Sequence, residues 1–213
     1  MRRRSMFIVV TIAVVIVALL SIWVIAGYLP TRGIEMPDYD VVEQRDGYEI
    51  RRYEPMIVAQ VYIEGEYGES LNRGFGKLAG YIFAQNRAEE PSRPEVRSGE
   101  IPMTSPVLTA ENGAGYSIAF VMPEDYSMET LPQPADPDVT LTESPSRHFA
   151  ALRFSGYATE TKVRRNIDLL KGFLERDGVE VEHRPIVAQY NPPWTPPFMR
   201  RNEILITIAW PKK

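Results

Sequence analysis

The 213-residue chain contains no cysteine. That absence excludes disulfide bonds, thiolate metal sites, thioester chemistry, covalent cofactor attachment through thioethers and a lipid-modified N-terminal cysteine. Histidine is scarce too, because His148 and His183 are the only two and lie far apart in the sequence. They form no recognisable metal-binding or triad motif. The sequence therefore predicts a function that depends neither on sulfur chemistry nor on a motif-bound metal ion.

The common signatures of catalysis are also missing. The chain has no Gly-x-Ser-x-Gly nucleophile elbow, no glycine-rich phosphate loop and no His-Glu-x-x-His zinc motif. Carboxylates are plentiful, but Glu203 and the others stand in no spacing that marks an acid–base pair. We therefore predict that the protein is not an enzyme.

Charge is distributed unevenly along the chain. There are 24 Lys and Arg residues and 28 Asp and Glu residues, and every acidic residue follows position 34. Setting aside Arg2, Arg3 and Arg4 leaves 21 basic against 28 acidic residues, a net charge of −7 for the remainder. Nucleic-acid phosphates would repel a body this acidic, so DNA and RNA are excluded as partners.

The one long apolar run covers residues 7–27 and contains no charged residue. About 20 helical residues cross the hydrocarbon layer of a bilayer. The Leu, Ile, Phe and Val residues of the run together contribute about −4 to −8 kcal/mol to insertion. The run therefore predicts an uncleaved membrane anchor. A cleaved secretory signal is the alternative, with Val24-Ile25-Ala26 as a processing site, although signal cores are usually only about 7–15 residues long.

The flanking charges predict how the anchor is oriented. Arginines on the N-terminal side should stay in the cytoplasm and send the C-terminal body across the membrane, with Trp23 and Tyr28 toward the far interface. The expected organisation is a cytoplasmic basic tail and transmembrane anchor over residues 1–28, a linker over 29–38, and one extracytoplasmic domain over 39–213.

Within the domain one pattern occurs twice. Alternating apolar residues over 57–63 end at Gly65, and an apolar helical stripe follows at Leu71, Phe75, Leu78 and Ile82. The same steps of four, three and four recur after a second alternating stretch that ends at Gly156; they are made by Val163, Ile167, Leu170 and Leu174. Two strand-then-helix units with one spacing indicate a duplicated fold in which each half packs a helix on its own piece of sheet. Chance similarity between two ordinary strand–helix pairs is the alternative.

The remaining elements follow from alternation and turn residues. Helices are expected from Ser70, as N-cap, to about Asn86, and over 159–176 with Thr159 as a cap. The links between strands are too short for parallel crossovers, so the sheet should be antiparallel. Strands are expected over residues 39–44, 48–53, 56–65, 107–111, 116–122, 139–143, 148–155, 184–190 and 203–210.

Several segments together resemble the SOUL haem-binding protein family. Residues 75–82 (Phe-Gly-Lys-Leu-Ala-Gly-Tyr-Ile) look like the family's first helix. The order and spacing of the matching segments between residues 35 and 210 make the resemblance specific. The other matching segments are Tyr48-Glu49-Ile50-Arg51-Arg52-Tyr53, Met103-Thr104-Ser105-Pro106-Val107, Tyr190-Asn191-Pro192-Pro193-Trp194 and Arg201-Asn202-Glu203.

The resemblance implies an α+β fold, a distorted antiparallel β-barrel of two pseudo-symmetric βαββ repeats with two α-helices, here preceded by one N-terminal transmembrane helix. That fold is shared with gyrase-inhibitor-like effector-binding domains. The resemblance also implies non-covalent binding of haem or another tetrapyrrole, without catalysis. This chain departs from some members at Arg52, where they carry a histidine proposed as an iron ligand. Arginine stays charged and cannot ligate iron, so axial ligation at this position is ruled out.

The matching segments, together with Met122 and the exposed aromatics, supply the expected cofactor-binding residues. Arginines would pair with propionates, tyrosines would cover the ring, and methionines would line an apolar pocket. Solvated charges and core packing are the ordinary alternatives for these residues. Trp194 and Phe198 would close a pocket, contact the membrane surface or seal the barrel end, and sealing is the ordinary role. His148 is a weak candidate iron ligand, and a strand-end surface residue is its alternative role. The expected residues are Arg51, Arg52, Tyr53, Met103, Met122, Tyr190, Trp194 and Phe198, with Arg200 and Arg201 as further propionate partners.

The sequence thus favours a membrane-anchored binding protein for haem or a related tetrapyrrole, held in an apolar cleft without strong axial ligation. Two alternatives stay open. One is a structural or protein-interaction domain, and the other is an effector-type pocket for a different small hydrophobic ligand.

Overall fold

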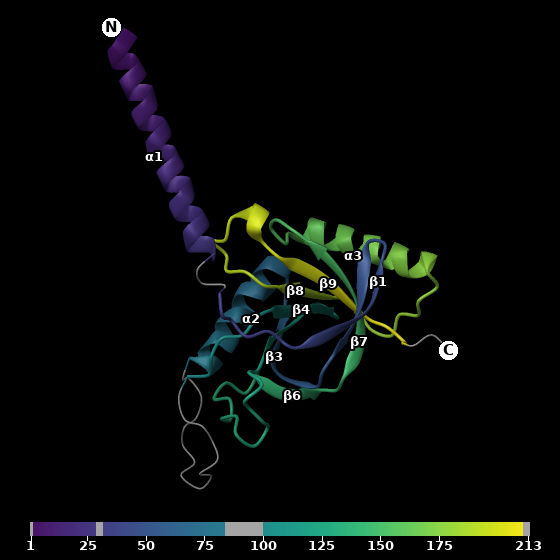
Figure 1. Ribbon diagram of the computed structural model, residues 1–213. Helices are drawn as coiled ribbons and strands as arrows, with labels where there is room; N and C mark the ends of the chain where they lie inside the picture. The colour runs from purple at the N-terminus through teal and green to yellow at the C-terminus, as the bar shows by residue number, and fades with distance from the viewer. Residues whose placement is uncertain (1, 29–31, 84–99, 211–213) are drawn as a thin grey trace.

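The structure is a computed structural model that describes residues 2–28, 32–83 and 100–210. A long helix, α1 (Arg2–Tyr28), projects away from an α+β body (Figure 1). Within the described residues α1 is the one helix long and apolar enough to cross a membrane, over Met6–Tyr28, and its most apolar stretch is not buried against the body. By length and composition it is a candidate membrane anchor or signal sequence.

One sheet forms the body. Every pairing in it is antiparallel, as predicted, although β8 and β9 are shorter than the expected strands. Its strands in the described residues are β1 (Tyr39–Arg45), β2 (Tyr48–Tyr53), β3 (Met56–Glu64), β4 (Val107–Asn112), β5 (Gly115–Val121), β6 (Thr140–Ser144), β7 (Arg147–Phe154), β8 (Ile186–Gln189) and β9 (Asn202–Thr207).

The strands are arranged symmetrically about the middle of the sheet. The order is β1-β2-β7-β9-β8-β4-β5-β3-β6, so β8 and β4 pair at the centre and each is followed outward by two strands of its own half. The next strand outward comes from the other half. β2, from the first repeat, pairs with β7 of the second, and β6, from the second repeat, pairs with β3 of the first. The two repeats are therefore interlocked. With β1 and β6 at the edges, the sheet is a curled half-barrel (Figure 1).

Each half packs one helix on the outer face of the sheet, as the repeat predicted. Helix α2 (Tyr67–Ile82) lies on β3 and β5, and its Leu78 is buried in one apolar core. Helix α3 (Glu160–Arg176) lies on β7 and β9, where Leu170 joins a second core. The N-cap of α3 is Thr159, whose side chain accepts a hydrogen bond from the Lys162 backbone N–H at 3.4 Å, as expected.

Helix α2 differs from the prediction at its start. Glu66 is the N-cap and makes no side-chain capping hydrogen bond, while Ser70 lies buried inside the helix. The face toward the sheet also differs, because Gly74 makes the closest approach to it, while Phe75 is 42% exposed and only packs edge-on against Phe120, with 5.3 Å between ring centres. A Cβ on Gly74 would lie 2.7 Å from Ile118 Cδ1, which leaves no room for a side chain there. Helix α2 ends at Ile82, and residue 86, its expected end, lies outside the described residues.

Candidate functional site

A buried ion cluster occupies the inner, helix-free face of the sheet. Arg51 on β2 donates to Glu203 on β9 through Nη1 at 2.8 Å, and the Glu203 carboxylate is completely buried. Tyr190 donates its hydroxyl to the same carboxylate at 2.7 Å, and Arg201 Nε donates to it at 3.0 Å. Burial alone would raise the pKa of Glu203, but the hydrogen bond and charge of Arg51, aided by Arg201, outweigh it and hold that pKa below its ordinary value. The cluster is internally satisfied, which favours a structural role.

Beside this cluster lies a small apolar cavity, which we call the inner-face cavity. Its volume is about 180 Å³, and its walls include Leu108, Phe149 and Leu205. Ligand pockets typically measure about 300–1,000 Å³. This concave apolar surface is too small for a macrocycle.

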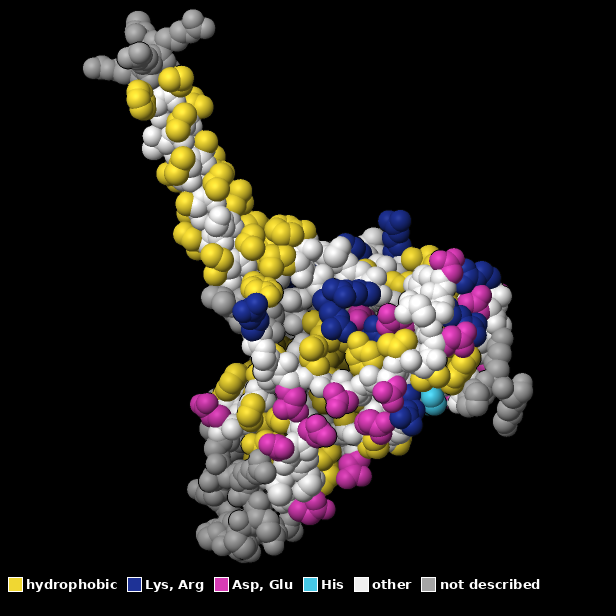
Figure 2. Space-filling view, viewed as in Figure 1, with side chains coloured by type: hydrophobic (Ala, Val, Ile, Leu, Met, Phe, Trp, Pro, Cys, Tyr) yellow, Lys and Arg dark blue, Asp and Glu magenta, His cyan; other side chains and the backbone are white. Residues whose placement is uncertain are grey.

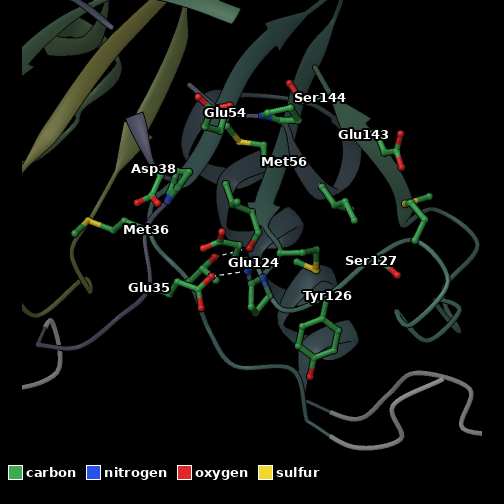
Figure 3. A pocket seen from close by; sticks show the side chains of 18 of the residues that line it. Glu35, Met36, Asp38, Glu54, Met56, Glu124, Tyr126, Ser127, Glu143 and Ser144 are labelled. Carbon is green, nitrogen blue, oxygen red and sulfur yellow. Dashed lines mark hydrogen bonds between the residues drawn. The ribbon is translucent and has the colours of Figure 1, made fainter. Parts of the chain in front are cut away.

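A larger hollow, the acidic cavity, opens where residues 35–38, the start of β3 and residues 122–129 meet. It measures about 550 Å³, and Met56, Met122 and Tyr126 contribute apolar walls. Figure 3 shows carboxylates distributed around it, and Glu35 accepts a hydrogen bond from the Glu124 backbone N–H at 2.6 Å. No Lys or Arg of the described chain lines it, so its field disfavours an anionic ligand. Its six carboxylates are Glu35, Asp38, Glu54, Glu124, Glu129 and Glu143.

A third hollow, the interhelical groove, lies between α3 and the first residue of α2, above β4, β5 and β8. It measures about 530 Å³, within the range of ligand pockets. The spacing of α3 places an apolar stripe against the sheet, and the groove runs along one side of that stripe. Its apolar lining consists of Tyr67, Tyr116, Val163, Ile167, Pro185 and Val187.

Two residues lining the groove carry buried hydroxyls without a hydrogen-bond partner among the described residues. They are Tyr67 and Thr109, which are 7% and 1% exposed. Buried polar groups are almost always paired, so unpaired ones beside a cavity indicate a place where a ligand or water completes the bonding. Burial raises the pKa of Tyr67, so its phenol stays protonated and able to donate.

The groove lining holds three cations and three carboxylates, Glu111, Glu160 and Asp168, and two of the cations form no ion pair within the described residues. Arg164 is paired with Glu160 at 2.8 Å. Lys171 and Arg184, in contrast, form no ion pair with any carboxylate of the described chain, and Arg184 donates only to the backbone carbonyl of Glu111, at 3.3 Å. These two cations stand beside an apolar floor, an arrangement that suits a flat ligand with carboxylates on its edge.

The residues expected from sequence to bind a cofactor fall into separate groups. Arg51, Tyr53 and Tyr190 meet on the inner face, around Glu203. The two methionines, 103 and 122, pack in the core under α2, and residue 122 also lines the acidic cavity. Trp194 and Phe198 are exposed on a loop beside α1.

The four arginines expected to bind propionates all have other partners. Arg51 and Arg201 bond Glu203. Arg52 is paired with Asp40 at 2.8 Å and with Glu54 at 3.2 Å, and Arg200 donates to the backbone carbonyls of residues 193 and 195. None of the four lines the interhelical groove.

No group of three or more histidine, aspartate or glutamate side chains in the described ranges is arranged to hold a metal ion. His148 lies on β7, opposite Arg52, and is partly exposed; His183 is exposed in a bend. Neither histidine lines the inner-face cavity, the acidic cavity or the interhelical groove.

Sequence reasoning missed Glu203 and the groove residues Tyr67, Lys171 and Arg184. One signal for Glu203 was available, because it is a charged residue at the start of an apolar strand, which requires a buried partner. The groove residues come from three distant segments, and only the packing of α3 against the sheet brings them together.

Comparisons with known proteins agree with this architecture. The family profile described as SOUL heme-binding protein matches residues 34–207. Among solved structures, the C-terminal domain of EcmrR is 10% identical with a TM-score of 0.56, and the match covers 80% of this chain and 98% of the other. A hydrolase from Listeria innocua is also 10% identical, with a TM-score of 0.56 and coverage of 79% of this chain and 94% of the other. Likeness at this identity concerns the fold alone. Comparison with curated protein sequences gave no match.

Proposed function

The chain belongs to the SOUL heme-binding protein family, and from this premise we propose that it binds haem or a related tetrapyrrole without covalent attachment in the interhelical groove. The proposal includes the anchor: α1 crosses the membrane, its arginines stay in the cytoplasm, and the body lies outside. The family supplies the ligand class. The choice among the three hollows comes from their chemistry.

One observation carries the choice of site. Lys171 and Arg184 stand at an apolar groove of sufficient volume, and both lack a carboxylate partner among the described residues. A haem has an apolar macrocycle and two propionates at one edge. Each propionate would meet one of these cations, while the macrocycle would lie against Val163, Ile167 and Val187.

The other hollows fit this ligand less well. The acidic cavity has enough volume, but six carboxylates around it would repel a dianion. The inner-face cavity has no net charge to overcome, yet about 180 Å³ is below the range of ligand pockets.

The groove offers no strong axial ligand for iron. No histidine, cysteine or methionine lines it among the described residues. The pKa of Tyr67 is raised by burial, which disfavours the phenolate that would bind ferric iron. Tyr67 and Thr109 would instead donate or accept hydrogen bonds at the edge of the ligand. Binding should therefore depend mainly on apolar contact and on the two propionates.

Haem titration of the full chain in detergent, followed by the Soret band, tests the function. We expect saturable binding at or below the micromolar range. The double variant Lys171→Glu, Arg184→Glu should weaken it by about tenfold or more, since each exposed ion pair contributes up to about 1 kcal/mol. A matched control, Arg73→Glu with Arg165→Glu, changes the net charge equally at exposed helix positions outside the groove.

The outcomes separate the function from the site. Absence of a Soret shift and of saturable binding in the wild-type chain would rule out the function. Binding that both double variants weaken equally would rule out the interhelical groove as its location, because only net charge would then matter.

A further inference from the structure

The loop over residues 191–200, which we call the proline loop, is seated on the last turns of α1. Trp23 Nε1 donates a hydrogen bond to the Trp194 carbonyl at 3.0 Å. The Thr195 hydroxyl donates to the Gly27 carbonyl at 3.4 Å and so satisfies one of the carbonyls that a helix end leaves unpaired. Gly27 is buried, and a Cβ there would overlap the Pro196 ring. Contact between helix and loop thus requires glycine at this position.

The other side of the proline loop is fixed to the body. Asn191 Oδ1 accepts the Arg201 backbone N–H at 2.6 Å, and the Pro197 carbonyl accepts the Gly156 N–H at 2.9 Å. Arg200 Nε donates back to the Thr195 carbonyl at 2.8 Å. Four prolines restrict the remaining backbone freedom. The loop is therefore a rigid connection between the helix and the sheet.

This rigid loop exposes large aromatic side chains at the end of an apolar helix. Trp194 is 56% exposed and Phe198 is 71% exposed, and the loop that carries them is bonded to Trp23 and Gly27 near the end of the span. Figure 2 shows the hydrophobic surface of α1 continuing onto the body at the base of the helix. Guanidinium groups accompany the aromatics: Arg32 lies 4.6 Å from the Tyr28 ring centre, and Arg200 lies 4.2 Å from that of Tyr157.

We propose that the proline loop is a second membrane contact, with Trp194 and Phe198 inserted into the interface of the leaflet in which α1 ends. The span ends at Tyr28, so a loop seated on Gly27 lies at the depth where amphipathic aromatic rings concentrate. Arg32 lies over the Tyr28 ring and Arg200 over the Tyr157 ring, where lipid phosphates would accept their hydrogen bonds. The body is then held against the bilayer in one orientation instead of moving freely on a tether.

This inference rests on the membrane anchoring that is part of the proposed function. It goes further, because an anchor alone does not require aromatic side chains of the body to enter the lipid. Its test uses the cysteine-free chain, since any introduced cysteine is then the only labelling site. Nitroxide spin labels at single cysteines report contact with oxygen, which concentrates in lipid, and with a water-soluble nickel chelate.

The labelled variants are Phe198→Cys, with Ile16→Cys as the lipid reference and Val181→Cys as the exposed reference on the body. The full chain is reconstituted in phosphatidylcholine vesicles. We expect the label at 198 to lose most of its contact with the nickel chelate relative to the label at 181, and to resemble an interfacial site. If the label at residue 16 is in lipid while the label at 198 contacts the chelate as much as the label at 181, the docking inference is wrong and the membrane anchor is still supported. If 16 is also exposed to the chelate, the anchor itself is wrong, and the docking inference is overturned with it.

A substitution in the helix tests whether the seating on Gly27 sets the position of the loop. Gly27→Leu, made in the Phe198→Cys chain, keeps α1 apolar but places a side chain where the Pro196 ring lies. It should restore contact between the label and the nickel chelate. Ala26→Leu adds the same side chain at an exposed neighbouring position and should leave the label unchanged. Equal values for both variants would overturn the inferred seating.

Discussion

Replacing Glu203 by alanine should be among the most destabilising single substitutions in the body. The Glu203 side chain is completely buried, and its partner Arg51 has a side chain that is 5% exposed. Truncation removes the carboxylate but leaves the guanidinium inside, with Glu49 at 2.7 Å as its remaining acidic partner. Breaking a buried pair in this way costs about 3–5 kcal/mol. For a body of this size, that lowers Tm by roughly 6–20 °C.

Thermal unfolding of the full chain in detergent, followed by circular dichroism at neutral pH, measures this loss. Asp40→Ala is the matched control, because it removes one of the two carboxylate partners of neighbouring Arg52, from an exposed pair. Such a pair contributes at most about 1 kcal/mol. If Glu203→Ala lowers Tm no more than Asp40→Ala does, the burial argument is wrong.

A double variant identifies the cause of the loss. Arg51→Met with Glu203→Met removes both buried charges and keeps apolar volume, so it should recover much of the stability lost in Glu203→Ala. Unfolding at or below the Tm of Glu203→Ala would instead indicate that lost packing, rather than an uncompensated charge, causes the effect.

Three further outcomes are expected. The pKa of Glu203 is lowered in the folded protein. Ionised Glu203 therefore stabilises the fold fully above the ordinary carboxyl pKa of about 4.3, and this stabilisation is lost as the pH falls through the lower pKa of the folded state. Glu203→Gln should reduce the fall in Tm at acid pH. In urea unfolding, Gly74→Ala should cost about 1–3 kcal/mol through overlap with the sheet, whereas Gly76→Ala, with no atom nearby, should add about 0.5–1 kcal/mol. The double variant His148→Ala, His183→Ala should keep the Soret band of bound haem, and its loss would show histidine ligation.

Local patterns in the sequence predicted the elements well where one strong signal marked them. Alternation and a three–four stripe located α3, and Thr159 supplied a side-chain cap at its start. Helix α2 lacks such a cap, so its N-cap, Glu66, was placed four residues too late, at Ser70. The stripe also favoured Phe75 over Gly74, because hydrophobicity does not report which helix position lies closest to a sheet. That depends on how near the two elements come to each other.

The candidate site was less predictable than the fold. The Arg51–Glu203 pair joins residues 152 positions apart, and which of two consecutive arginines is buried depends on strand register. The family resemblance included the segments of both residues, but in the structure Arg51 and Glu203 bond each other. The interhelical groove brings together Tyr67, Lys171 and Arg184 only because α3 packs on β7 and β9, beside the residues of β4 and β8 that line the groove.

The exchange of β2 and β6 has a consequence for how such a body can be divided. Each repeat donates its leading strand to the other, so a fragment ending after β5 or beginning at β6 would expose an unpaired ladder where the borrowed strand belongs. Neither fragment should be soluble and ordered by itself, whereas the two produced together should reassociate. Although the architecture has the form of a duplication, the present body is indivisible, and the two halves of the sheet should unfold in one cooperative step.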